Sequence, residues 1–389
     1  MIYTVPRVIG SYAIEDVQAR RLWNWLLRRQ GLSDETRLRS VAEIAYASLG
    51  LHAARLPSPY ATVLARSKSP TVALSLFSPT ARHELTTIRC MRKTLHALPL
   101  ELAAVAHSAT KHFRERDALR AIANAGVSGR EVTRSTDVIV KFLKSNGAVH
   151  CRDIEADVTG RGLSVVAVRV ALKLAWERGT LTYQNDAAGW NRGHRKFGLT
   201  HLIYPALDMA MDGVKATNRL LEAYFDRYGP ASLRDAKWWS GLSRAAIVTA
   251  MNESSREIVA VRTPWTESAL YMFQDRLDEY TSAASDEMAT GINFLAPEDV
   301  ALKAYFESRR RYLGALSPGR AFNQIGEVLP TIVLEGQVVG TWRWDSSRKA
   351  VTASLARGCG SSQLRQDVER AATAMTSSLR AGWIKAMDR

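Results

Sequence analysis

The sequence has few cysteines, and their spacing does not match a metal site or a disulfide framework. Cys90, Cys151 and Cys359 lie far apart, and no Cys-x-x-Cys pair is present. This excludes a thiolate zinc site, a four-cysteine iron–sulfur cluster and disulfide stapling, and it suits a reducing compartment. We therefore expect neither a metal nor another cofactor.

Long apolar runs and nucleotide-binding motifs are also missing. No apolar run approaches the ~20 residues that a membrane span needs. The opening residues, MIYTVPRVIGSY, lack the charged start, apolar stretch and cleavage site of a secretory signal. A P-loop, a glycine-rich dinucleotide fingerprint, a His-Glu-x-x-His pair and a nucleophile elbow are all absent. The sequence predicts a cytoplasmic protein without membrane contact.

Acidic residues are outnumbered by basic ones. The chain of 389 residues has 38 Asp and Glu against 53 Lys and Arg, which gives a formal net charge of +15. A cationic surface raises both the on-rate and the affinity for polyanions, and DNA is the commonest of these in the cytosol. The alternative is a basic protein that binds no polyanion. With 46% hydrophobic and 23% charged residues the chain is globular, and its length predicts two to four units.

Helical periodicity dominates, interrupted by short extended pairs. An amphipathic stripe predicts a helix over 14–30, and Ser40 caps a second helix that Gly50 ends. A short helix follows Pro57 and Pro59, and β-branched residues then predict a ribbon from LTTIRCM and KTLHALPL. Three helices followed by a ribbon are the order of a winged helix.

This order recurs twice more, which predicts a tandem array. The second unit has expected helices at 137–146, 151–158 and 163–179, then a strand, a polar turn over 185–196 and a second strand. The long third helix would be its recognition helix, and the strand–turn–strand its wing. The third unit begins at Thr217, with a helix ended by Gly229 and Pro230, a helix pair in 232–254 and a strand at 257–263.

The last hundred residues predict a small β-rich domain with a terminal helix. Two or three strands are expected in 328–356, with turns at Glu335-Gly336 and at 345–348, and a helix from Gln363 onward. The expected fold class is α+β, mainly α, with three tandem winged helices and this C-terminal domain. The expected units are 1–130, 131–212, 213–285 and 286–389.

Three stretches carry a resemblance to a known family. RYGPASLRDAKWWSGLSRAAI, CMRKTLHALP and PTIVLEGQVVGTWRW resemble segments of the bacterial winged-helix DNA glycosylases of the azinomycin-resistance (AlkZ-like) and crosslink-repair type. In order and spacing the likeness covers nearly the whole chain, and DAKWWSGL is its most specific part. The resemblance implies a C-shaped molecule in which the C-terminal domain is barrel-like and duplex DNA occupies the concavity.

The resemblance also implies where the catalytic residues lie. Family members are monofunctional glycosylases with a Gln-x-Gln or Gln-x-Asp motif after the second helix, just before a proline. Here that place reads Leu51-His52-Ala53-Ala54-Arg55-Leu56-Pro57. His52 therefore stands at the first glutamine position, and Ala54, at the second, supplies no polar group. Support would have to come from elsewhere, and the nearest candidates in sequence are Glu43, Arg55 and Tyr60.

The chemistry of such an excision is compatible with a histidine. An N7- or N3-alkylated purine is already cationic, so the protein must place a water below the anomeric carbon and stabilise a cationic sugar. Side-chain acceptors achieve this without a metal or a Schiff-base lysine. A neutral imidazole with a pKa of about 6.5 can accept the water's hydrogen, so we expect activity to fall as pH drops through that pKa. The alternative is that His52 is an ordinary loop histidine.

Two basic segments are candidate DNA contacts. No acidic residue occurs between Asp186 and Asp208, where a wing turn would present its cations to a groove and its indole to a base step. The candidates of this turn are Trp190, Arg192, His194, Arg195 and Lys196. A second set in the first ribbon is Arg89, Arg92 and Lys93. Either set could instead be a solvated face.

Four tryptophans and one basic run have simpler interpretations than binding to a base. Trp23, Trp25, Trp238 and Trp239 stand at helical spacing beside apolar residues, which predicts core rather than base-stacking platforms. The run 307–312, ESRRRY, predicts a basic helix face that either touches phosphate or is solvated.

The expected function is that of a monomeric DNA glycosylase associated with the nucleoid. Its partner would be double-stranded DNA carrying alkylated purines or crosslinks, in repair or in self-resistance to a genotoxic natural product. The alternative is a noncatalytic winged-helix DNA-binding protein, either a lesion sensor or a regulator.

Overall fold

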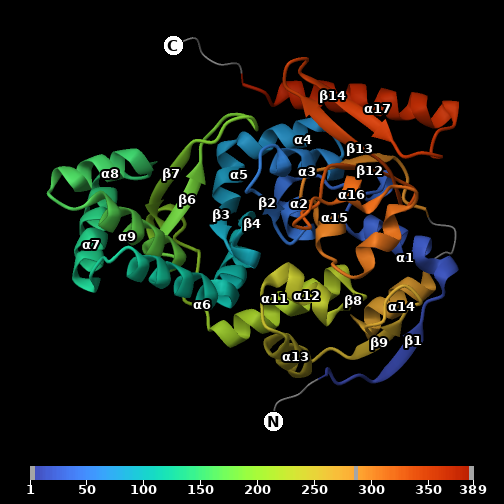
Figure 1. Cartoon of the computed structure of the whole chain (residues 1–389), viewed down its shortest axis with the longest axis horizontal. Helices are drawn as coiled ribbons and strands as arrows, with labels where there is room; N and C mark the ends of the chain where they lie inside the picture. The colour runs from blue at the N-terminus through green and yellow to red at the C-terminus, as the bar shows by residue number, and fades with distance from the viewer. Residues whose placement is uncertain (1–4, 284–287, 385–389) are drawn as a thin grey trace.

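The first unit contains the predicted catalytic motif. The structure, a computed structural model, describes residues 5–283 and 288–384 (Figure 1). The elements of this unit are α1 (Ala19–Arg29), α2 (Val41–Ala47), β2 (Leu51–His52), α3 (Ser58–Arg66), α4 (Pro70–Leu74), α5 (Pro79–Glu84), β3 (Leu85–Arg89) and β4 (Leu95–Pro99). Ser40 begins α2 as predicted, since its hydroxyl accepts a hydrogen bond from the Glu43 amide at 3.1 Å.

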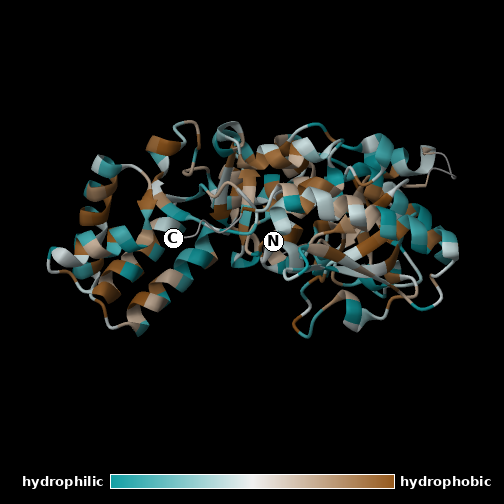
Figure 2. Ribbon diagram, turned by 90° about the horizontal axis from the view of Figure 1, so that it is seen from above, coloured by the Kyte–Doolittle hydropathy of each residue, from teal (hydrophilic) through white to brown (hydrophobic). Residues whose placement is uncertain are grey.

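The second unit forms a lobe at one end of the molecule, set apart from the rest in the view from above (Figure 2). A 25-residue helix that the sequence analysis left unassigned, α6, leads into it. The elements are α6 (Leu100–Asn124), α7 (Gly129–Asn146), β5 (Val149–His150), α8 (Cys151–Gly160), α9 (Val165–Glu177), β6 (Leu181–Asn185), β7 (Arg195–Leu199) and α10 (Thr200–Ile203). The helix predicted at 137–146 begins earlier, at Gly129, because Ser128 and Glu131 form a reciprocal capping box before it.

The third unit has the same order of helices and strands as the second, and it lies beside the first unit in space. Its elements are α11 (Gly213–Tyr228), β8 (Ala231–Ser232), α12 (Leu233–Ser240), α13 (Arg244–Glu253), β9 (Ile258–Arg262), β10 (Leu270–Phe273) and α14 (Gln274–Ser282). The strand β1 (Gly10–Ala13), from the opposite end of the chain, pairs in parallel with β9. Its sheet therefore has the order β1-β9-β10-β8.

Strands of the first and second units form one continuous sheet. Its order is β2-β4-β3-β6-β7-β5, and the two halves join where Thr87 of β3 pairs with Tyr183 of β6. The predicted ribbons β3–β4 and β6–β7 are thus the centre of a six-stranded sheet. The short strand β2, which carries His52, is one edge of it.

The C-terminal unit is an antiparallel meander under a long helix. Its elements are β11 (Ile292–Leu295), α15 (Val300–Lys303), α16 (Pro318–Ala321), β12 (Thr331–Leu334), β13 (Gln337–Asp345), β14 (Ala350–Leu355) and α17 (Ser362–Ala381). The turns predicted at 335–336 and 345–348 join β12 to β13 and β13 to β14. Among the described strands, β11-β12-β13-β14 form an open sheet whose two edge strands do not pair with each other, so no closed barrel is seen there.

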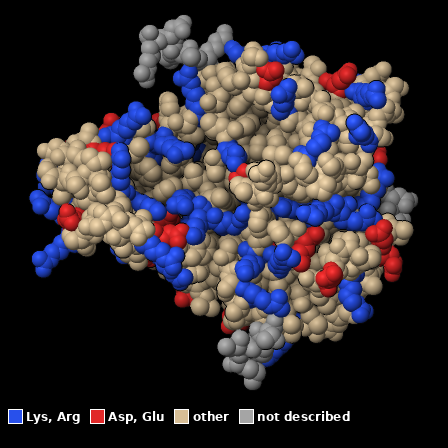
Figure 3. Space-filling view, in the orientation of Figure 1, with Lys and Arg blue, Asp and Glu red and all other residues tan. Residues whose placement is uncertain are grey.

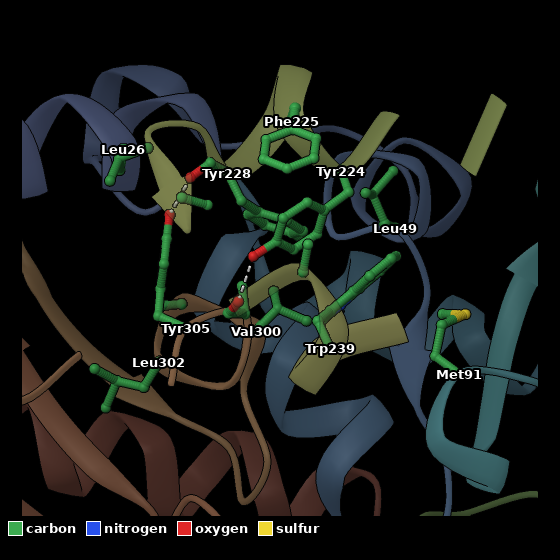
Figure 4. Close-up of a cluster of buried hydrophobic side chains, with 14 of the residues drawn as sticks. Leu26, Leu49, Met91, Tyr224, Phe225, Tyr228, Trp239, Val300, Leu302 and Tyr305 are labelled. Atoms are coloured by element: carbon green, nitrogen blue, oxygen red, sulfur yellow. Dashed lines mark hydrogen bonds between the residues drawn. The ribbon is translucent and has the colours of Figure 1, made fainter. Parts of the chain in front are cut away.

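The core joins the third unit to the first and to the C-terminal unit. Tyr224 and Tyr228 of α11 lie against Trp239 of α12, and Tyr305 approaches from beyond α15 (Figure 4). The buried hydroxyls are satisfied: Tyr224 donates to the Ala304 carbonyl at 2.7 Å, and Tyr305 donates to the Tyr228 carbonyl at 2.9 Å. These bonds fix the segment after β11 against α11 and thereby help to position the side chains described next. The core placement predicted for Trp23, Trp25 and Trp239 is confirmed.

Candidate active site and nucleic-acid interface

His52 lies on the edge strand β2 and faces a second histidine. The register pairs His52 with His96 of β4, so both side chains project from the same face of the sheet. Their rings lie 5.6 Å apart, nearly perpendicular, and each side chain is only 5% exposed. Gly50, at φ +104°, permits this close pairing, since a Cβ there would come within 2.6 Å of the Leu98 side chain.

Both histidines are neutral. Burial, followed by the nearby charge of Lys303, lowers the pKa of His52 to about 2 and that of His96 to about 3. Nδ1 of His52 is buried and has no hydrogen-bond partner. The expected loss of activity near pH 6.5 therefore requires correction, because this imidazole does not acquire a proton there.

Lys303 comes from the C-terminal unit, on a segment anchored to α3. Asp299 forms a fully buried, two-bond ion pair with Arg66, at 2.7 and 2.8 Å. Glu298, at φ +61°, accepts a hydrogen bond from the Val328 amide at 2.6 Å and pairs with Lys303. Both Glu298 and Lys303 are about 5% exposed or less. The segment 298–303 thus holds a buried charge pair near a strand some 250 residues earlier in sequence.

The first ribbon and the third unit contribute a stacked pair. In the turn between β3 and β4, Arg92 adopts φ +51° and its guanidinium lies 3.7 Å from the ring centre of Trp238. Arg309 lies 5.3 Å from the same ring. Trp238 is only half-buried, so its predicted place in the core is wrong. Its indole is a platform for two arginines.

Arg309 does not share the exposed basic face predicted for 307–312, whereas Arg310 and Arg311 are exposed. The predicted basic helix face is a 3-10 helix, Ser308–Leu313, in which Arg309 is 5% exposed. Its guanidinium lies 4.0 Å from the ring centre of Phe322, and burial lowers its pKa to about 10. This arginine is therefore neither solvated nor on an open face.

Arg55 completes the set of charged groups around His52. It pairs with Glu327 at 2.6 Å, and the amide of Asn323 donates to the same carboxylate at 2.7 Å. Arg55 and Arg92, like Lys303, contribute to lowering the pKa of His52. We call the following residues the central cluster: His52, Arg55, Arg92, His96, Trp238, Glu298, Lys303, Arg309 and Glu327.

Several predicted site residues lie elsewhere. The Glu43 carboxylate accepts a hydrogen bond from the Arg39 amide at the exposed start of α2, and the buried Tyr60 hydroxyl donates to the Ser378 carbonyl of α17. Both side chains therefore form their hydrogen bonds away from the central cluster. Ala54 is exposed.

In the first ribbon, only one of the three basic candidates joins the central cluster. Arg89 pairs with the buried Glu177 of α9, and Lys93 pairs with Asp117 of α6. Both ion pairs fasten the ribbon to the helices that lead into the second unit. Arg92 alone points to the cluster, through its stacking on Trp238.

The wing of the second unit docks on the C-terminal helix. Trp190 is only 6% exposed: its indole NH donates to the Leu379 carbonyl at 2.8 Å, and its ring packs edge-on against Trp344 and Trp383. An indole held in this way is not available to a base step, so that prediction is wrong for Trp190. The next residue, Asn191, exchanges two hydrogen bonds of 2.9 Å with the backbone of Ile384.

The cations of this wing differ in their freedom. Lys196 pairs with Asp186 at 2.5 Å, and His194 lies 3.6 Å from the same carboxylate. Arg195 is exposed and Arg192 is partly exposed. Arg192 and Arg195 are therefore the stronger candidates for phosphate contact.

Basic side chains gather on one face of the molecule. Figure 3 shows a band of Lys and Arg that crosses the middle of this face, from the lobe of the second unit toward the C-terminal unit, beside a hollow. Interspersed acidic residues are few along the band. Such an arrangement has the charge and extent needed to follow a nucleic-acid backbone.

An apolar cavity lies on the other side of the sheet from His52. It measures about 240 Å³, and its lining in the first two units includes five aromatic residues: Tyr60, Phe77, Tyr183, Trp190 and Tyr204. Ala53 and Ala97 also line it, and they alternate with His52 and His96 along their strands. The cavity and the two histidines thus occupy opposite faces.

Other classes of site find no support in residues 5–283 and 288–384. No group of three or more His, Cys, Asp and Glu side chains there could hold a metal ion. In the same described ranges, no helix has both the length and the apolar character for crossing a membrane.

Comparisons with known proteins agree with this architecture. The structure is similar to that of the Streptomyces sahachiroi DNA glycosylase AlkZ, with a TM-score of 0.69 and 18% identity over 93% of this chain and 96% of that one. At that identity the likeness shows the fold. A search of curated protein sequences finds no match. The family model "DNA glycosylase AlkZ-like" matches residues 46–377, which is most of the chain. The resemblance seen in the sequence is confirmed, and the chain belongs to the AlkZ-like DNA glycosylase family.

Proposed function

We propose that the protein is a monofunctional glycosylase that excises bulky N7- or N3-alkylated purines from duplex DNA, including purines joined in interstrand crosslinks. It would act as a monomer on the nucleoid, in repair or in self-resistance to a genotoxic natural product. The observation that carries the proposal is His52: a neutral imidazole with an unpartnered Nδ1, at the family's first glutamine position and among cations from the first and the C-terminal units. The family membership supports a glycosylase in general.

The cations of the central cluster suit DNA binding rather than leaving-group chemistry. Arg55 and Arg92 lie close enough to His52 to shift its pKa, and phosphates flanking a lesion would be held by such groups, whereas Lys303 is buried and paired with Glu298. Arg192 and Arg195 would extend this contact along the duplex. Each phosphate neutralised releases counterions, so affinity would fall steeply with salt.

His52 would act by holding the attacking water. An alkylated purine leaves as a neutral base, so the bond from C1′ to N9 breaks without protonation of the leaving group. The positive charge passes to the sugar, and the water oxygen then bonds to C1′. An acceptor that fixes this water contributes typically ~10²–10⁴-fold in rate.

The test is single-turnover incubation with a duplex that carries one defined N7-alkylguanine, followed by alkali to cleave abasic sites. Strand cleavage at the lesion is expected, and His52→Ala should reduce the rate at least ~10²-fold with unchanged DNA affinity. A panel of small and bulky adducts would define the preference. Binding without excision of any N7- or N3-adduct would instead support the noncatalytic reader of the same fold, which the absence of a second acceptor at Ala54 favours.

A further inference from the structure

The family motif has polar side chains at both of its positions, whereas this chain has only one. Here the first position is His52, at the end of β2, and the second is Ala54, which lies in the bend after that strand, is exposed and has no polar atom in its side chain. A second acceptor must therefore come from another strand if the water is to be held at two points.

The neighbouring strand supplies one. His96 is the direct register partner of His52. Directly opposed residues of antiparallel strands lie about 4.5–5.5 Å apart. The two ring centres lie 5.6 Å apart, with their planes nearly perpendicular.

The hydrogen bonds of His96 fix its tautomer. Its Nδ1 lies 3.2 Å from the Thr94 carbonyl, which can only accept, so Nδ1 carries the proton and donates it. The Cys90 sulfur, 3.5 Å from the same nitrogen, is a thiol because burial raises the pKa of Cys90 to about 12. Nε2 of His96 therefore carries a lone pair. The neutral imidazole of His52 offers the other acceptor through whichever ring nitrogen lacks the proton.

We propose that His96 is a second catalytic residue, and that its Nε2 and the imidazole of His52 together accept the two hydrogens of one attacking water. This inference rests on the proposed glycosylase function. In the family motif, two residues of one short segment hold the water. Here the water would be held by a pair of residues on two neighbouring strands.

The pair orients the water and does not need to deprotonate it in advance. As the C1′–N9 bond breaks, its electron pair goes to the cationic purine, which leaves neutral. The oriented water oxygen then bonds to C1′, and the resulting protonated hydroxyl is acidic enough to release its proton to either imidazole or to solvent. The products are the free base, the abasic sugar with a C1′ hydroxyl, and one proton.

The experiment compares matched variants in single-turnover excision at saturating enzyme. His96→Phe keeps a ring but removes the acceptor, and should slow excision about 10²-fold while DNA affinity is unchanged. His96→Gln retains an acceptor and should stay within about tenfold of wild type. The matched control is His107→Gln, which changes an equally buried neutral histidine of α6, 1% exposed and bonded to Arg114, outside the central cluster. It should leave the rate of folded protein unchanged.

A double-mutant cycle tests whether one water is shared. If it is, His52→Ala combined with His96→Phe should be no more than a few-fold slower than the slower single variant, because either change alone already releases the water. Independent roles would instead multiply the two losses, and this result would overturn the proposal. Thermal melts of each variant accompany the rates, so that loss of folded protein is not counted as loss of catalysis.

A second measurement does not depend on choosing the right lesion. DNA with a cationic pyrrolidine at the abasic position imitates the charged sugar, and a tetrahydrofuran residue is its neutral counterpart. Wild type should prefer the cationic analogue about tenfold or more, and both His52→Ala and His96→Phe should remove the preference. If wild type excises a base and His52→Ala does not, but His96→Phe is unaffected in both assays, the assignment of His96 fails and the glycosylase function stands. If wild type neither excises nor discriminates, both fail.

Discussion

Three buried histidines make acid sensitivity the most quantitative prediction of this structure. His52, His96 and His107 are 5%, 5% and 1% exposed, and burial lowers their pKa values to about 2, 3 and 3. In the unfolded chain each would titrate near 6.5. Because the folded pKa values are the lower ones, the unfolded state binds more protons in mild acid. Stability is therefore fully present above pH 6.5 and is lost as pH falls below it.

The size of the loss follows from the unfolded pKa alone, provided that the folded values stay well below the working pH. Lowering the pH from 7.5 to 5.5 costs about 1.4 kcal/mol for each such histidine, or about 4 kcal/mol for three. Typical folding free energies are about 5–15 kcal/mol, so this is a large share. Excision by the protein that remains folded should not change over the same range, because His52 stays neutral.

Urea denaturation at pH 7.5, 6.5 and 5.5 measures the loss, with single-turnover excision and a background without enzyme at each pH. His107→Gln removes one titrating group, so its loss between pH 7.5 and 5.5 should be smaller than that of wild type by about 1.4 kcal/mol. An unchanged loss in this variant would refute the reasoning. So would a tenfold fall in the excision rate of folded protein by pH 5.5, the behaviour of a histidine with an ordinary pKa.

Three further predictions concern the interface and its supports. Changing Arg192 and Arg195 together to Ala should weaken duplex binding and reduce the log–log salt slope by about two, as measured by fluorescence anisotropy, whereas Lys196→Ala, which removes a cation already paired with Asp186, should change it less. Trp190→Ala should cost about 3–5 kcal/mol of unfolding free energy in urea denaturation, because the indole is buried against α17; an unchanged midpoint would contradict this docking. Asp299→Asn should destabilise by about 3–5 kcal/mol, since it leaves Arg66 buried without its countercharge, and Arg66→Met with Asp299→Leu should recover most of that loss.

The ends of several helices and strands were predictable from sequence because their signals are local. Ser40 as an N-cap, Gly229 with Pro230 after α11, and the turn at Glu335-Gly336 each decide a boundary within a few residues, and the structure has those boundaries. The long helix α6 was missed because its apolar and polar residues do not follow one stripe. Residues 103–110 are buried all round, so periodicity gave no signal there.

The central cluster could be predicted only in part. His52 and Arg55 were found from the place of the family motif, and Arg92 as one of the basic residues of the first ribbon, but Glu298 and Lys303 belong to a segment that carries no motif. Their place depends on the buried pair between Asp299 and Arg66, a contact across 233 residues. Trp190 and Trp238 were misassigned for a related reason. Spacing along one element cannot reveal whether a distant element covers a side chain, as α17 covers Trp190, or leaves it as a platform, as for Trp238.

A strand pair explains how a family motif can lose a residue while its chemistry is retained. The relative position of two acceptors on one segment depends only on the local conformation of that segment. The relative position of a pair across β2 and β4 depends on the register and on the distance between the two strands. Gly50 secures both, because the contact of its backbone with Leu98 leaves no room for a side chain. The neutral state of the pair depends first on burial and then on the charge of Lys303, which segment 298–303 brings from the C-terminal unit. The requirement for a second acceptor is thus moved from one position of a motif to the packing of two units, where an alignment of the motif alone would not detect it.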